Sequence, residues 1–150
     1  MNRPSAFVLI LLTSIISCKP EHPDLKTAYD LFKDSQLIKQ NMITGQADLN
    51  NQAKMVDSKI RNEDKESVFA ISEVYNHLEA VDAGMKALNG RDRAVPGHEK
   101  ESQEIPVADP KLSPSLVLMM QKNYRDSLLI IKNDLDAAAT LLNHLKTKFN

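Results

Sequence analysis

The sequence has little cysteine, glycine or aromatic character, and its charges nearly balance. It contains one cysteine, four glycines and no tryptophan, and its formal net charge is −1. A single cysteine cannot form a disulfide within the chain. The scarcity of glycine and aromatic residues disfavours a β-sandwich, which needs many turns and β-branched or aromatic strands. The near-zero charge argues against a nucleic-acid partner, which would require a basic face. We therefore expect a helical protein that binds no nucleic acid.

Recognisable catalytic and cofactor motifs are also missing. No serine stands in a glycine-flanked elbow, and no glycine-rich loop could hold a phosphate. Di-iron helical bundles use a Glu-x-x-His motif. That motif is absent here, because Val74 and Leu141 stand three residues before His77 and His144. The sequence therefore predicts a non-enzymatic protein with no cofactor and no metal.

Two groupings of acidic residues and histidines are the remaining candidates for an ion site. Glu73 and His77 lie four residues apart, so their side chains can meet on a helix, and His144 could approach from another helix. The second grouping lies in a proline-containing stretch and consists of His98, Glu99, Glu101 and Glu104. Solvated side chains are the simpler interpretation of both groupings, so the prediction stays at no metal site.

A signal-peptide pattern occupies the amino terminus. Arg3 precedes an apolar core from Ala6 to about Ile16, and Ser17 then stands directly before Cys18. This core is shorter than the roughly 20 apolar residues that a transmembrane helix needs. A small residue followed by cysteine, after aliphatic residues, matches the bacterial lipobox. The match implies that the Cys18 thiol is diacylated and that signal peptidase cuts between Ser17 and Cys18.

Cleavage at this point divides the chain into three parts. We predict a signal peptide at residues 1–17, a lipid-anchored linker at 18–23 and a helical bundle at 24–150. The mature protein would lie in the bacterial cell envelope, and we expect the outer membrane facing the periplasm, with surface exposure as the alternative. Its partners would be the membrane, through the lipid on Cys18, and a protein of unknown identity.

Three segments show the three- and four-residue spacing of apolar side chains that is typical of helices. They cover about residues 24–61, 63–89 and 114–149, with Asp24, Asn62 and Ser113 as caps. Gly45 could interrupt the first helix, and Asn89-Gly90 ends the second. The third helix has the widest apolar face, so we expect it to contact both others. The predicted fold class is all-α, an antiparallel three-helix bundle.

A long loop at residues 91–113 connects the second and third predicted helices. At ~1.5 Å per residue, the second helix is about 15 Å too short to cover its neighbours. The loop must therefore continue along the bundle. We predict that Val95-Pro96 and Ile105-Pro106-Val107 pack near Phe32 and Met120, while residues His98 to Glu104 project into solvent.

Three stretches of the second half carry a resemblance to known proteins. They are Leu78-Glu79-Ala80-Val81-Asp82-Ala83-Gly84-Met85, Val95-Pro96-Gly97-His98-Glu99 and Leu112-Ser113-Pro114. In this order they resemble uncharacterised small helical lipoproteins of Bacteroidota, some of which are labelled "viral A-type inclusion protein". Members of that group often have a tryptophan after the position of Met85 and a histidine-rich tract after that of His98, and this sequence has neither. The resemblance implies a fold and a location, and no activity.

Together these features predict a lipid-anchored envelope protein with a non-enzymatic structural or protein-interaction role. The alternative is a periplasmic binding module for an apolar ligand or a cation. Methionines on the apolar faces, such as Met42 and Met85, would fill the core or line a groove for such a ligand. A contiguous exposed apolar patch would favour a protein partner, whereas an enclosed pocket with convergent polar groups would favour a ligand.

Overall fold

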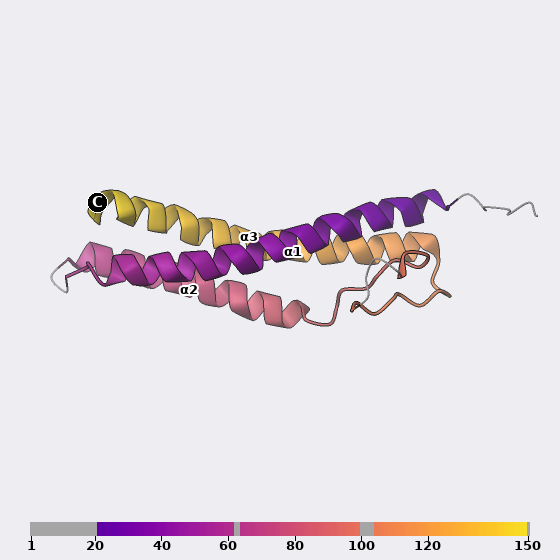
Figure 1. Ribbon diagram of the computed structural model, residues 1–150, viewed down its shortest axis with the longest axis horizontal. Helices are drawn as coiled ribbons and strands as arrows, with labels where there is room; N and C mark the ends of the chain where they lie inside the picture. Colours follow the sequence, from indigo (N-terminus) through magenta and orange to yellow (C-terminus); the bar gives the residue numbers. More distant parts are fainter. Residues whose placement is uncertain (1–20, 62–63, 100–103, 150) are drawn as a thin grey trace, which may run out of the picture.

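Three long helices form the bundle. The computed structural model describes residues 21–61, 64–99 and 104–149, with helices α1 (Pro23–Asp57), α2 (Lys65–Leu88) and α3 (Pro114–Phe149). α1 and α3 run in the same direction and α2 runs in the opposite one (Figure 1). Both α1 and α2 pack mainly against α3 and contact each other far less. The predicted all-α bundle, with the third helix at its centre, is confirmed.

α1 is one uninterrupted helix, so Gly45 does not break it. It begins at Pro23, one residue before the predicted start, because the cap is His22 and not Asp24. The Nδ1 atom of His22 accepts a hydrogen bond from the Asp24 amide at 3.2 Å, and Pro23 at the first helical position has no N–H that needs a partner. α1 ends at Asp57, earlier than the predicted residue 61, because the amides of Lys59 and Ile60 bond to carbonyls three residues back instead of four.

α2 and α3 begin at side-chain caps. The Asp64 carboxylate accepts hydrogen bonds from the amide and the hydroxyl of Ser67, at 3.2 and 2.8 Å. The predicted cap of this helix, Asn62, lies outside the described residues. α2 starts after the predicted residue 63 because Asp64 itself is the cap. The hydroxyl of Ser113 accepts a hydrogen bond from the Leu116 amide at 3.3 Å, and the predicted bounds of the third helix, 114–149, are confirmed.

The main core lies along α3, where apolar side chains from all three helices are buried. Leu78 and Leu135, at the centres of their predicted apolar faces, are 3% and 8% exposed. The other large side chains of this core are Met42, Val56, Ile71, Val74, Val81, Leu88, Tyr124, Leu128, Ile131, Leu142 and Leu145. Among the described residues, no helix is both long enough and apolar enough to span a bilayer.

Two glycines inside helices differ in the space around them. A Cβ added to Gly84 would lie 2.7 Å from Cγ1 of Ile131, whereas one added to Gly45 would lie 3.4 Å from Cδ2 of Leu135. Alanine is more favourable than glycine inside a helix by about 1 kcal/mol. We expect Gly45→Ala to raise the free energy of unfolding by up to about 1 kcal/mol, and Gly84→Ala to lower it by about 1–3 kcal/mol through overpacking. Urea unfolding of both variants measures this, and changes of the same sign would contradict the close packing of α2 on α3.

The connection between α2 and α3 covers the part of the bundle that α2 does not reach. Figure 1 shows it beside the first turns of α1 and α3. A second core there consists of Ala28, Phe32, Ala94, Val95, Ala108 and Val117. The predicted return of the loop along the bundle, with Val95 packed near Phe32, is confirmed. The predicted contact with Met120 is wrong, because Val117, nearly one turn earlier on α3, lies in the second core instead.

In the returning half of the connection, the prediction is confirmed for Ile105, which is partly buried against the second core, and is wrong for the two residues that follow it. Pro106 and Val107 are exposed, and Ala108 is buried in their place. The Ala94 amide donates to the Pro106 carbonyl, and the Ala108 amide donates to the Ala94 carbonyl, both at 2.9 Å. Successive side chains of an extended segment point to opposite sides, so an exposed Val107 places Ala108 inside. This pairing fixes the two halves of the connection to each other.

Candidate functional site

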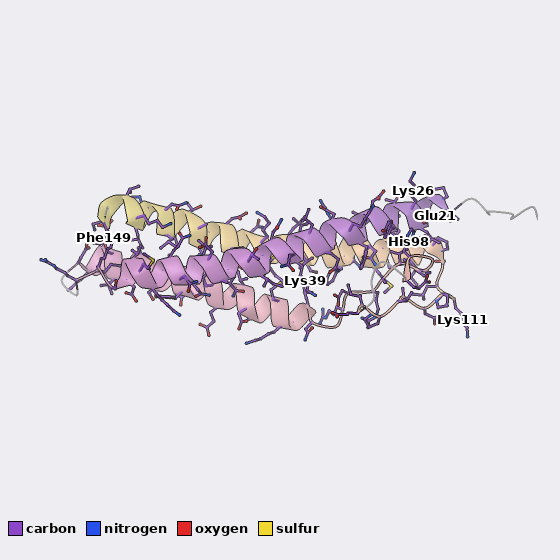
Figure 2. All side chains as sticks on the ribbon, in the orientation of Figure 1. Glu21, Lys26, Lys39, His98, Lys111 and Phe149 are labelled. Carbon is purple, nitrogen blue, oxygen red and sulfur yellow. The ribbon has the colours of Figure 1, made fainter. Side chains whose placement is uncertain are left out.

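The residues predicted for lipid attachment and cleavage, Cys18 and Ser17, lie outside the described residues. The first described residue, Glu21, is three positions after Cys18 and two before α1. Glu21, Lys26, His98 and Lys111 gather at the end of the bundle opposite Phe149 (Figure 2). We call this region the anchor end; it is made of residues 21–33, the described residues of the connection and the first two turns of α3. It is the described part of the molecule nearest to the predicted lipid.

Four side chains at the anchor end join the connection to the start of α1. The ring of His98 stacks on that of Tyr29, with centroids 3.6 Å apart and planes 7° from parallel. The Nε2 atom of His98 lies 2.8 Å from Oε1 of Glu21. The ammonium group of Lys33 lies 4.4 Å from the centroid of the Tyr29 ring, within range of a cation–π interaction. We call Glu21, Tyr29, Lys33 and His98 the clasp, because they hold the chain before α1 against the connection.

The prediction that His98 projects into solvent is wrong. The Tyr29 ring covers one face of the imidazole and shields it from water. The Nε2 atom of the imidazole lies beside the Glu21 carboxylate. The neighbouring Glu99 accepts a hydrogen bond from the Gly97 amide at 2.8 Å, which lowers the pKa of the Glu99 carboxyl group. Glu104 is exposed, and Glu101 lies outside the described residues. In the described part of the connection, His98 therefore belongs to the clasp, where its carboxylate partner is Glu21.

A polar layer beneath the connection fixes its first residues. Asp92, only 8% exposed, lies 3.1 Å from the ammonium group of Lys39 on α1. Burial favours a lower pKa for Lys39, but the hydrogen bond to Asp92 and the nearby negative charge outweigh it, so the pKa is raised. Gln121 of α3 donates to the Arg93 carbonyl at 2.7 Å. This layer was not predicted from the sequence, although Gln121 stands four residues from Val117 on an apolar face and could have marked it.

The side chains considered for a metal site on the helices, Glu73, His77 and His144, do not come together. The Nδ1 atom of His77 lies 2.9 Å from Oδ1 of Asp134 on α3, while Glu73 accepts a hydrogen bond from Asn76 at 3.1 Å. His144 is exposed on the far turns of α3. Within the described ranges, no group of three or more His, Cys, Asp or Glu side chains could hold a metal ion. The pair of His77 and Asp134 therefore acts as a link between α2 and α3.

Two surface grooves are the candidate ligand sites. One, of about 470 Å³, lies between α1 and α2, where Ile43, Gln46 and Tyr75 contribute to its walls. The other, of about 430 Å³, lies between α1 and the connection, with Gln36 and Glu104 in its lining. Both linings mix apolar side chains with amides and carboxylates, and neither contains a serine, cysteine or histidine. The grooves thus offer hydrogen bonds to a polar molecule.

The end opposite the anchor end exposes apolar side chains. We call the last turns of α1 and the first turns of α2 the distal end. There Val68 and Phe69 are adjacent in the chain and are 41% and 68% exposed. The Asp64 cap accepts hydrogen bonds from Lys148 and Ser67, and these lower the pKa of the Asp64 carboxyl to about 2. The contact with Lys148 ties the last turn of α3 to the start of α2, so the distal end is held in place.

Comparisons with known proteins identify no family for this chain. The resemblance to small helical lipoproteins of Bacteroidota therefore stays a prediction. No protein-family model, no curated protein and no solved structure matches the sequence or the fold.

Proposed function

We propose that the protein is a lipid-anchored component of the bacterial envelope with a non-enzymatic role, in which the bundle holds a protein-binding surface away from the membrane. α1 has 35 residues and α3 has 36, so each spans about 50 Å at ~1.5 Å per residue. The predicted lipid is attached a few residues before α1, at the anchor end. The distal end then lies about one helix length from the point of attachment.

The exposed pair of Val68 and Phe69 is the observation that carries the protein-interaction role. Aromatic side chains are enriched at protein interfaces and frequently supply much of the binding energy. Phe69 is 68% exposed and lies in the first turns of α2, at the distal end. A ligand-binding module is the alternative, but both grooves are open and lack the enclosed, convergent polar arrangement of a small-molecule site.

Phe69→Ala is expected to reduce recovery of the partner by about tenfold or more, as for a central interface residue. The test is mild chemical cross-linking in intact membranes, followed by purification through a tag and quantification of the proteins recovered. Ile130→Ala is the matched control, because Ile130 is also 68% exposed but lies in the middle of α3. Equal recovery with both variants would contradict a binding surface at the distal end.

A further inference from the structure

We propose that the anchor end rests on the lipid headgroups, so that the bundle stands on the bilayer with its distal end outward. This inference deepens the proposed function and depends on anchoring through Cys18. It concerns a second contact with the membrane, made by the folded bundle itself. The partner is the phosphate and glycerol region of a phospholipid surface.

The length of the tether is the first argument. Glu21 is three positions after Cys18, and a fully extended chain covers at most ~3.6 Å per position, or about 11 Å in all. Glu21 is already part of the clasp, through its contact with His98 at 2.8 Å, and His22 caps α1. The headgroup layer on one side of a bilayer is about 5–7 Å thick. A lipid on Cys18 therefore leaves room for little more than this layer between the hydrocarbon and the bundle.

The side chains of the anchor end suit such a surface. Lys26 and Lys111 are exposed at this end, on opposite sides of the bundle (Figure 2). Leu116 and Met119, in the first two turns of α3, are 36% and 50% exposed. Lysine ammonium groups can donate to lipid phosphates while their stems and nearby apolar side chains cover the boundary with the acyl chains.

Carboxylates at the same end limit the strength of this contact. Asp24 lies in the first turn of α1, and Asp109 accepts a hydrogen bond from the Lys111 amide at 2.9 Å. Because charges of both signs are present, the headgroup contact does not recruit the protein by itself. The lipid on Cys18 supplies the affinity, and the anchor end sets the orientation.

Energy transfer to labelled headgroups tests this orientation. The acylated protein is placed in vesicles of phosphatidylethanolamine and phosphatidylglycerol that contain an acceptor-labelled headgroup. Because acylation occupies Cys18, the only cysteine, a new cysteine can carry a donor dye either at exposed Thr27, as Thr27→Cys, or at exposed Lys59, as Lys59→Cys. We expect transfer from residue 27 to exceed transfer from residue 59 several-fold. Equal transfer from both residues would mean that the bundle lies flat on the membrane. Weak transfer from both would mean that the bundle does not contact the headgroups. Either result overturns the proposal.

A double variant tests whether side chains of the anchor end contact the headgroups, or whether the short tether alone keeps residue 27 close to the membrane. Leu116→Ser with Met119→Ser should lower the transfer from residue 27 and broaden its distribution, while the circular dichroism spectrum stays unchanged. Ile130→Ser is the control, because it removes an even more exposed apolar side chain from the middle of α3, far from the anchor end. An unchanged signal in the double variant overturns the headgroup contact. Failure of the anchoring itself is seen separately, as an intact mass without acyl chains and loss of flotation with the vesicles.

Discussion

Ile131→Ala is expected to lower the free energy of unfolding by about 2–5 kcal/mol, the range for deleting a large buried aliphatic side chain. Ile131 is 9% exposed and belongs to the main core. It packs directly over Gly84 of α2, where even an added Cβ would approach it to 2.7 Å. A glycine has no side chain that could move into the space left by the deletion. The cavity should therefore persist at the contact between α2 and α3.

Ile130→Ala is the matched control, because the same chemical change is made one residue away on the same helix. Ile130 is 68% exposed, so we expect a loss of less than about 0.5 kcal/mol. The difference in helix propensity between isoleucine and alanine is common to both variants and cancels. Urea unfolding measures both free energies with the same extrapolation. If both variants lost a similar amount of unfolding free energy, α3 would have to be rotated about its axis from the orientation that buries Ile131 and exposes Ile130.

Cys18→Ser is expected to abolish lipid attachment completely. Transfer of the diacylglyceryl group requires the thiol as nucleophile, and a serine hydroxyl is far less reactive because the thiolate is the attacking species of cysteine. Without the lipid, signal peptidase should not cut before residue 18, so the protein should accumulate with residues 1–17 still attached. Electrophoresis and mass spectrometry of membrane fractions measure both effects.

Ser17→Ala is the control for this variant, because alanine preserves the small residue before the cysteine. We expect normal cleavage and normal lipid attachment with Ser17→Ala. If Cys18→Ser had the same mass and the same membrane partitioning as the wild-type protein, the lipobox interpretation would be refuted.

Helix positions could be predicted where local signals agree with the apolar spacing. Ser113 and Pro114 combine a cap with a proline at the first helical position, and α3 begins there. Asn89-Gly90, predicted to end the second helix, follows the last residue of α2, and Gly90 has a left-handed φ of 72°. The start of α1 was misplaced because its cap is His22, which is not a usual capping residue.

The contacts of the connection could not be predicted from local pattern. Whether Val107 or Ala108 is buried depends on hydrogen bonds to Ala94, which is distant in the sequence. The clasp likewise brings His98 against Tyr29 of α1, although the acidic residues around His98 suggest a solvated loop. The mismatch in predicted helix lengths shows that the connection returns along the bundle, but the register of its residues follows from tertiary packing.

The intact mass of the wild-type protein, extracted from membranes in detergent, tests lipid anchoring most directly. We expect a chain that begins at Cys18 and carries at least a diacylglyceryl group, with residues 1–17 removed. A chain that retains Met1, or one that begins at Cys18 with an unmodified thiol, would contradict lipid anchoring.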